Sequence, residues 1–148
     1  MSLYSGSIQL IVVGKLKTPH WSSAQTEYIR RIPRYISFEL KEVKDGPNEE
    51  AALLEASKTA HSRIVLTPEG KSLDSPGLAR FLQKQLDTYQ KLSFLMGGPE
   101  GLSSEVIGHS QSQLSLSAMT FPHELARVIF LEQLYRAFTI LSGEKYHK

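Results

Sequence analysis

The chain has 148 residues, contains no cysteine and carries a formal net charge of +2. Its length suits one domain, and the lack of cysteine excludes disulfides, thiolate metal sites and a cysteine nucleophile. No apolar run approaches the roughly 18 residues that a membrane span needs, and the first residues lack a signal-peptide pattern, so we expect a cytoplasmic protein.

The first third of the sequence predicts a strand, a helix and a second strand. Residues 1–7 are small, polar and unpatterned, which indicates a flexible end or a cloning remnant. The apolar run 8–13 predicts a buried strand. A helix is expected over 18–32, because proline suits its first turn and Pro33 stops it. Apolar and polar residues alternate over 36–43, which is typical of a half-covered strand.

The rest of the chain continues to alternate between helices and strands. Helices are predicted over 49–60, 75–90, 103–109 and 122–141, strands over 63–67, 92–96 and 113–117, and a loop over 68–74. This alternation predicts an α/β fold, with a parallel-rich sheet and helices on both faces. Ligands in such sheets bind beyond the carboxyl ends of strands. We therefore expect the site in the loops after Leu66, Met96 and Ser117.

Positive charge gathers in the segment from Lys15 to Lys44. It holds seven lysines and arginines against three glutamates. A surface of this kind can bind phosphates by releasing counterions, and it can equally be an ordinary solvated face.

Two short motifs could carry chemistry. Gly97-Gly98-Pro99-Glu100-Gly101 follows a predicted strand, so it is either a tight structural turn or a loop that lets a ligand approach the backbone. It is not a P-loop, because no Gly-Lys-Ser/Thr follows. His123-Glu124-Leu125-Ala126-Arg127 begins like a zinc-protease helix but has arginine at the position of the second metal ligand, so we expect no metal there. His123 and Arg127 lie one turn apart and could together meet a polyanion, or be an ordinary helix-start histidine and a surface arginine.

The C-terminal region has two further unusual features. The predicted helix 122–141 is more apolar than one buried stripe requires, so it is either deeply buried or shared with a partner subunit. Tyr146-His147-Lys148 places aromatic, titratable and cationic groups together, which could contact a nucleotide. A disordered tail is the ordinary alternative. A serine hydrolase is disfavoured, because no G-x-S-x-G elbow occurs.

Several segments match one family in order and spacing. They are Leu-Ile-Val-Val-Gly-Lys near the start, 63–66 with 69–71, 94–102, 114–123, Arg127-Val128, 132–137 and Tyr146-His147-Lys148. With these segments, the chain resembles the bacterial 23S ribosomal RNA pseudouridine N3-methyltransferase family (RlmH-like), in the SPOUT class of knotted methyltransferases. The likeness extends from about Ile8 to the end, which implies one SPOUT domain over 8–148.

The resemblance implies a deep C-terminal trefoil knot, S-adenosyl-L-methionine as cofactor, a homodimer, and ribosomal RNA of the large subunit or the assembled ribosome as substrate, with no metal and no membrane. The reaction would be methylation of N3 of a pseudouridine in 23S ribosomal RNA. The implied cofactor residues are Leu66, Gly97, Gly98, Gly101, Leu116, Ser117, Ala118, Met119, Thr120 and Phe121. The implied catalytic residues are His123, Arg127, Tyr146, His147 and Lys148, with the last three reaching the cavity of the other subunit.

Two alternatives stay open at this point. One is another SPOUT reaction, on a different ribosomal or transfer RNA base or on a ribose 2′-hydroxyl. The other is a non-catalytic, ribosome-associated RNA-binding factor. The proton acceptor is also open, with His123, His147 and Glu100 as candidates, and Arg127 or Lys148 would stabilise the resulting anion.

Overall fold

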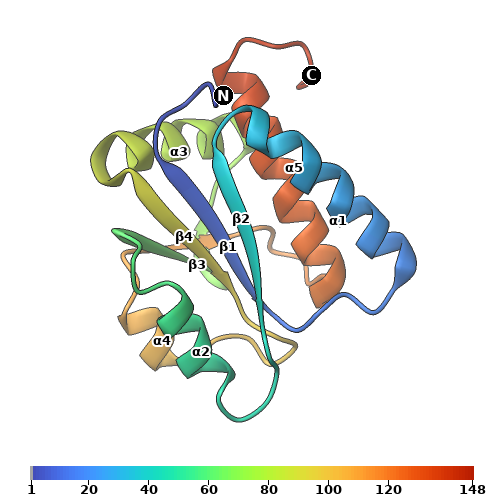
Figure 1. Ribbon diagram of the computed structural model, residues 1–148, viewed down its shortest axis with the longest axis vertical. Helices are drawn as coiled ribbons and strands as arrows, with labels where there is room; N and C mark the ends of the chain where they lie inside the picture. The colour runs from blue at the N-terminus through green and yellow to red at the C-terminus, as the bar shows by residue number, and fades with distance from the viewer. Residues whose placement is uncertain (1) are drawn as a thin grey trace.

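A computed structural model describes residues 2–148 and shows a single five-stranded sheet at the centre of the molecule (Figure 1). The strands are β1 (Ser7–Val13), β2 (Ser37–Val43), β3 (Ser62–Ser72), β4 (Lys91–Met96) and β5 (Ser112–Ser115). They lie in the order β2-β1-β4-β3-β5, and every neighbouring pair is parallel. The carboxyl ends of all the strands therefore point to the same edge of the sheet.

Helices cover both faces of this sheet, as the alternating pattern predicted (Figure 1). They are α1 (Pro19–Arg31), the short 3₁₀ helix η1 (Ile32–Arg34), α2 (Glu49–Ala56), α3 (Ser75–Tyr89), α4 (Ser104–Gly108) and α5 (His123–Leu141). Helices α1, α3 and α5 lie on one face, and α2 and α4 lie on the other. Among residues 2–148, no helix is both long and apolar enough to cross a bilayer.

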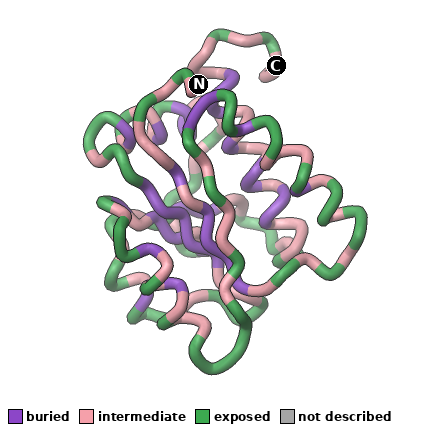
Figure 2. Tube along the Cα trace, in the orientation of Figure 1, coloured by how far each residue is buried: buried purple, intermediate pink, exposed green. Residues whose placement is uncertain are grey.

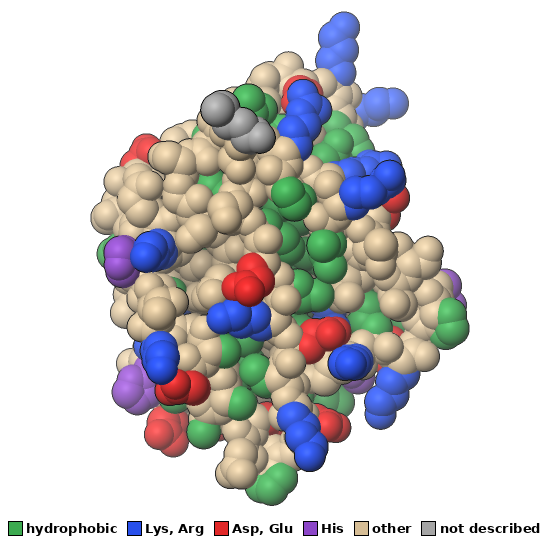
Figure 3. All heavy atoms as spheres, viewed as in Figure 1, with side chains coloured by type: hydrophobic (Ala, Val, Ile, Leu, Met, Phe, Trp, Pro, Cys, Tyr) green, Lys and Arg blue, Asp and Glu red, His purple; other side chains and the backbone are tan. Residues whose placement is uncertain are grey.

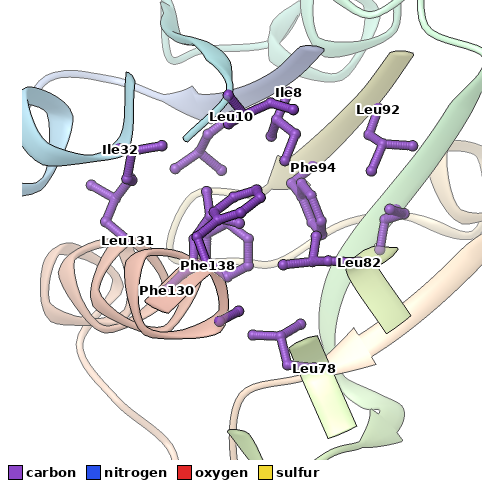
Figure 4. Packing of buried hydrophobic residues seen from close by; sticks show 14 of the residues in the cluster. Ile8, Leu10, Ile32, Leu78, Leu82, Leu92, Phe94, Phe130, Leu131 and Phe138 are labelled. Carbon is purple, nitrogen blue, oxygen red and sulfur yellow. The ribbon is translucent and has the colours of Figure 1, made fainter. Parts of the chain in front are cut away.

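The sheet separates two apolar cores, because successive side chains of a strand point to opposite faces. Leu10 belongs to the larger core under α1, α3 and α5, and its neighbour Ile11 belongs to the smaller one under α2 and α4. In the larger core the Phe94 ring of β4 meets the Phe130 ring of α5, with 4.9 Å between centroids (Figure 4). The central strands are consequently buried on both sides (Figure 2).

The apolar richness of α5 is explained within the chain. Its side chains Val128, Phe130, Leu131, Leu134, Ala137 and Phe138 are all buried. Helix α5 packs between α1 and α3, so more than one of its faces is covered (Figure 1). Of the two possibilities left open by the sequence, deep burial therefore accounts for most of this surface.

Two predicted boundaries were wrong. The helix predicted over 49–60 ends at Ala56, and the Ser57 hydroxyl then donates to the Leu53 carbonyl oxygen. The loop predicted over 68–74 is largely strand, because β3 continues to Ser72 after a register shift between Leu66 and Lys71. The sequence over 68–74 is typical of a turn and gives no clear indication of such a bulge.

The N-terminal segment contacts the rest of the domain at Tyr4. The Tyr4 N–H donates to the Tyr35 carbonyl oxygen at 2.7 Å, and the Tyr4 ring lies 5.5 Å from that of Phe138. Of the segment 1–7, Met1 lies outside the described residues, and Ser7 begins β1.

Replacing Phe138 by alanine tests the larger core. Phe138 is fully buried and stacks on the Tyr35 ring at 5.7 Å, so Phe138→Ala should lower the free energy of unfolding by about 3–5 kcal/mol. Leu3→Ala is the control, because Leu3 is 61% exposed and its loss should change the free energy by less than about 0.5 kcal/mol. Urea unfolding at matched protein concentration measures both, and equal effects would contradict this core.

Candidate functional site

A cavity of about 400 Å³ lies beyond the carboxyl ends of β4 and β5 and beside β3 at its register shift, between Leu66 and Lys71. It is lined by 66–68, by 96–99 with Gly101, by 115–123 and by Ala126. These segments are the middle of β3 at its register shift, the loops after β4 and β5, and the first turn of α5. They meet because β4, β3 and β5 are parallel neighbours in the sheet.

All ten residues that we expected to bind a cofactor line this cavity. They are Leu66, Gly97, Gly98, Gly101, Leu116, Ser117, Ala118, Met119, Thr120 and Phe121. The sequence prediction missed Thr67, Pro68, Met96, Pro99, Ser115, Pro122 and Ala126, which also line it. Most of them adjoin the ends of predicted strands, and Pro122 and Ala126 lie at the start of the predicted helix 122–141. Neither position tells a lining residue from its neighbours.

The glycine loop after β4 forms a tight turn and also lines the cavity. The Gly101 N–H donates to the Gly98 carbonyl oxygen at 3.0 Å, and Gly101 adopts a φ of +77°. A Cβ atom on Gly97 would lie 2.6 Å from the Gly101 carbonyl oxygen, so the turn closes only with glycine there. Glu100 does not line the cavity but a neighbouring depression that Asp45 also lines, which disfavours it as a proton acceptor in the cavity.

The loop after β5 is shaped by its own serines. The Ser115 hydroxyl donates to the Ser117 carbonyl oxygen at 3.0 Å, and the Ser117 hydroxyl accepts the Met119 N–H at 2.9 Å. The Met119 side chain is 72% exposed although it borders the cavity. An exposed thioether beside a cavity is available to cover an apolar ligand.

The chemistry of the cavity is mostly apolar. Leucine, methionine, proline and phenylalanine side chains make up much of the lining, and strand-end backbone groups provide polar atoms. His123 is its one ionisable lining residue within 2–148. In the same range, no group of three or more histidines and carboxylates is placed to hold a metal ion. Such a lining suits a planar heterocycle with hydrogen-bonding edges.

His123 and Arg127 do not share the surface that their spacing indicated. His123 is exposed and lines the cavity, whereas Arg127 is only 3% exposed and does not. The Arg127 guanidinium donates to the Gly14 carbonyl oxygen at 2.9 Å, to that of Val13 at 3.2 Å and to Glu42 at 3.0 Å. Burial lowers the pKa of Arg127, and the Glu42 carboxylate opposes this effect. In this arrangement Arg127 cannot contact an anion in the cavity.

The C-terminal tail folds back on α5 of its own chain. The Tyr146 hydroxyl donates to Glu132 at 2.7 Å, and His147 lies 3.1 Å from the Arg136 guanidinium. Burial, together with the Glu132 carboxylate, raises the pKa of Tyr146 well above its ordinary value. Glu132 is nine residues along α5 from His123, which corresponds to about 13 Å of helix. Within one chain, the tail therefore lies away from the cavity.

Comparisons with known proteins point to one family. The profile of a family described as a predicted SPOUT methyltransferase matches residues 7–147. A protein named Ribosomal RNA large subunit methyltransferase H, from Coprothermobacter proteolyticus, is 42% identical over 142 residues, which cover 95% of this chain and 99% of that protein.

Solved structures share the fold at low sequence identity. A probable methylase family protein from Haemophilus influenzae has a TM-score of 0.61 and 12% identity, over 95% of this chain and 70% of that one. The SpoU methyltransferase AviRb from Streptomyces viridochromogenes, solved in complex with the cofactor AdoMet, has a TM-score of 0.52 and 14% identity, over 96% and 60%.

The glycine turn gives a direct test of the cavity wall. Gly97→Ala forces a Cβ against backbone, so it should lower the free energy of unfolding by about 1–3 kcal/mol. Gly98→Ala is the matched control, because its Cβ would meet its nearest neighbour at 3.6 Å and should cost less than about 0.5 kcal/mol. Denaturant unfolding measures the free energy of unfolding of both variants. A loss in Gly98→Ala as large as that in Gly97→Ala would contradict this geometry.

Proposed function

Because the chain belongs to the SPOUT methyltransferase family, we propose that it methylates RNA of the large ribosomal subunit with S-adenosyl-L-methionine as methyl donor. The acceptor is N3 of a pseudouridine in 23S ribosomal RNA. The main support is that the middle of β3 and the loops after β4 and β5 form one cavity, in a chain 42% identical to a named large-subunit methyltransferase.

The cavity suits the proposed cofactor in size and chemistry. Its volume of about 400 Å³ is within the usual range for small-molecule sites, roughly 300–1,000 Å³. Leu66, Leu116 and Phe121 offer apolar walls for an adenine ring, and strand-end backbone groups can hydrogen-bond its edge. The turn at Gly97 brings backbone close to the ligand without a side chain. When bound, the cofactor supplies a methyl group activated by its positively charged sulfur.

The protein must position the acceptor base and accept one proton. Transfer of the methyl group to N3 would require the N3 proton to leave to a base. His123 is the candidate acceptor from the cavity's own chain, because it is exposed at the first residue of α5 and lines the cavity. Orientation at close range is the larger part of catalysis for such a displacement.

The proposal includes a homodimer in which the tail of one subunit completes the cavity of the other. Tyr146, His147 and Lys148 carry groups suited to a nucleotide, yet Tyr146 and His147 are held on the distant half of α5 in their own chain. A second copy brings a tail to the cavity without unwinding α5. The trefoil knot and the cytoplasmic location, where bacterial ribosomes work, are parts of the same proposal.

Cofactor binding tests the assignment of the cavity. Titration calorimetry should show binding of S-adenosyl-L-methionine to the parent protein and at least tenfold weaker binding to Ala126→Phe, because the new ring fills space beside the cofactor. Ala51→Phe, on exposed α2 surface, is the control and should bind as the parent does. Equal affinity in all three would place the cofactor elsewhere, and no binding at millimolar cofactor would favour a non-catalytic RNA-binding factor.

Mixing two inactive variants tests the shared site. A chain lacking 146–148 should bind the cofactor but fail to methylate large ribosomal subunits. Ala126→Phe keeps the tail but should also fail, because it binds the cofactor too weakly. In a mixed dimer, one of the two sites has both an intact cavity wall and an intact tail. About half of the dimers are mixed, so mixing should restore up to about a quarter of parental activity. Nucleoside mass spectrometry measures N3-methylpseudouridine. Full activity of the shortened chain, or no recovery on mixing, would refute the composite site.

A further inference from the structure

The first turn of α5 holds the loop between β1 and α1 through two charged side chains. Arg127 donates to the Val13 and Gly14 carbonyl oxygens, and Glu124 accepts the N–H groups of Thr18 at 3.2 Å and Lys17 at 3.4 Å. Burial alone would raise the pKa of Glu124, but these two backbone donors lower it below its ordinary value. Both side chains thus hold this short loop, and Arg127 also pairs with Glu42 of β2.

The same turn of α5 forms a wall of the cavity. His123 and Ala126 line the cavity, and they alternate along the helix with Glu124 and Arg127. Across the sheet, the Val13 side chain lies 3.6 Å from where a Cβ of Gly98 would be, and Gly98 also lines the cavity. The loop over 14–18 is therefore attached to the same part of α5 that lines the cavity.

This loop carries two exposed lysines, Lys15 and Lys17. The other cations of the basic segment are mostly paired: the ion pairs are Arg30 and Arg31 with Glu27, Arg34 with Glu144 and Lys41 with Glu39. Within 2–148, none of the ion pairs involves Lys15, Lys17 or Lys44, and Lys44 is followed directly by Asp45. Lysine and arginine side chains lie over the ends of β1 and β2 and the start of α1 (Figure 3).

We propose that Lys15 and Lys17 bind phosphates of the RNA that flank the nucleotide entering the cavity, and that Arg127 and Glu124 are positioning residues for this contact. The proposal rests on the proposed function, because it names how the substrate of that site is held. Phosphate contacts set the register and orientation of a nucleic acid on a protein. Because the loop over 14–18 is held by α5, phosphates bound by its two lysines would lie at a fixed distance from the cavity.

Salt dependence is the direct test of the two lysines. Methylation of large ribosomal subunits by Lys15→Gln/Lys17→Gln should show a roughly 10- to 30-fold lower kcat/KM near 0.1 M salt. The slope of log kcat/KM against log salt should become shallower by about 1.5, because each lost phosphate contact removes about 0.7–0.9. Lys91→Gln is the matched control, because Lys91 is exposed at the amino end of β4, the sheet edge opposite the cavity. An unchanged slope in the double variant would overturn the proposal.

The positioning role of Arg127 and Glu124 needs a measurement that does not change merely because the fold is less stable. Arg127→Gln and the milder Glu124→Ala should each raise KM for the ribosomal particle while leaving cofactor affinity within about twofold of the parent. Combined with the double lysine variant, either should add little, because residues that act through one another are not additive. Trp21, the one tryptophan, lies in the first turn of α1, next to the loop over 14–18. A change in its fluorescence emission would report release of this loop. Full multiplicative effects in the combined variants would refute the positioning role.

Failure of this inference is distinguishable from failure of the proposed function. Cofactor binding and methyl transfer by the parent protein test the function alone. Equilibrium binding of a fluorescent 23S ribosomal RNA fragment tests the lysines without any turnover. If RNA affinity depends on salt concentration equally in the parent protein and the double variant, the two lysines do not bind phosphates, even if the enzyme is active.

Discussion

The carboxyl ends of β4, β3 and β5 meet at one sheet edge, and the candidate site depends on that constraint. Because the strands are parallel and adjacent, the register shift of β3 and the loops after β4 and β5 converge there, although they lie far apart along the chain. The Gly97 turn, and the hydrogen bonds of the Ser115 and Ser117 hydroxyls in the loop after β5, then shape the cavity. A site built this way leaves its side chains available for an apolar ligand.

Helix α5 links this site to the rest of the molecule. Its apolar side chains anchor the larger core, its first turn contributes His123 to the cavity, and Arg127 fastens the loop after β1. A buried arginine that satisfies backbone carbonyl oxygens is costly to remove, because those acceptors would then be left unpaired. The helix therefore ties stability, cavity geometry and the placement of the nearby lysines to a single element.

Much of this arrangement could be predicted from the sequence. The proline at Pro19 and the stop at Pro33 set the limits of α1 correctly, and the strand-end loops were the right place to look for a cavity. The role of Arg127 could not be predicted, because a spacing of four residues shows which helix face a residue occupies but not what covers that face. The continuation of β3 depends on Gly70 lying against the Leu114 backbone, a close approach that only the folded chain reveals. The docking of Tyr146 on Glu132 likewise depends on tertiary packing.

The central claim is that one cofactor occupies the space between the middle of β3 and the loops after β4 and β5. The most direct measurement is an amide NMR titration of the protein with S-adenosyl-L-methionine. The account predicts that the amides of 66–68, 96–101 and 115–123 shift together with a single affinity, while those at the opposite edge, near Lys91, stay in place. Shifts confined to one of these three segments, or centred on another face, would contradict it.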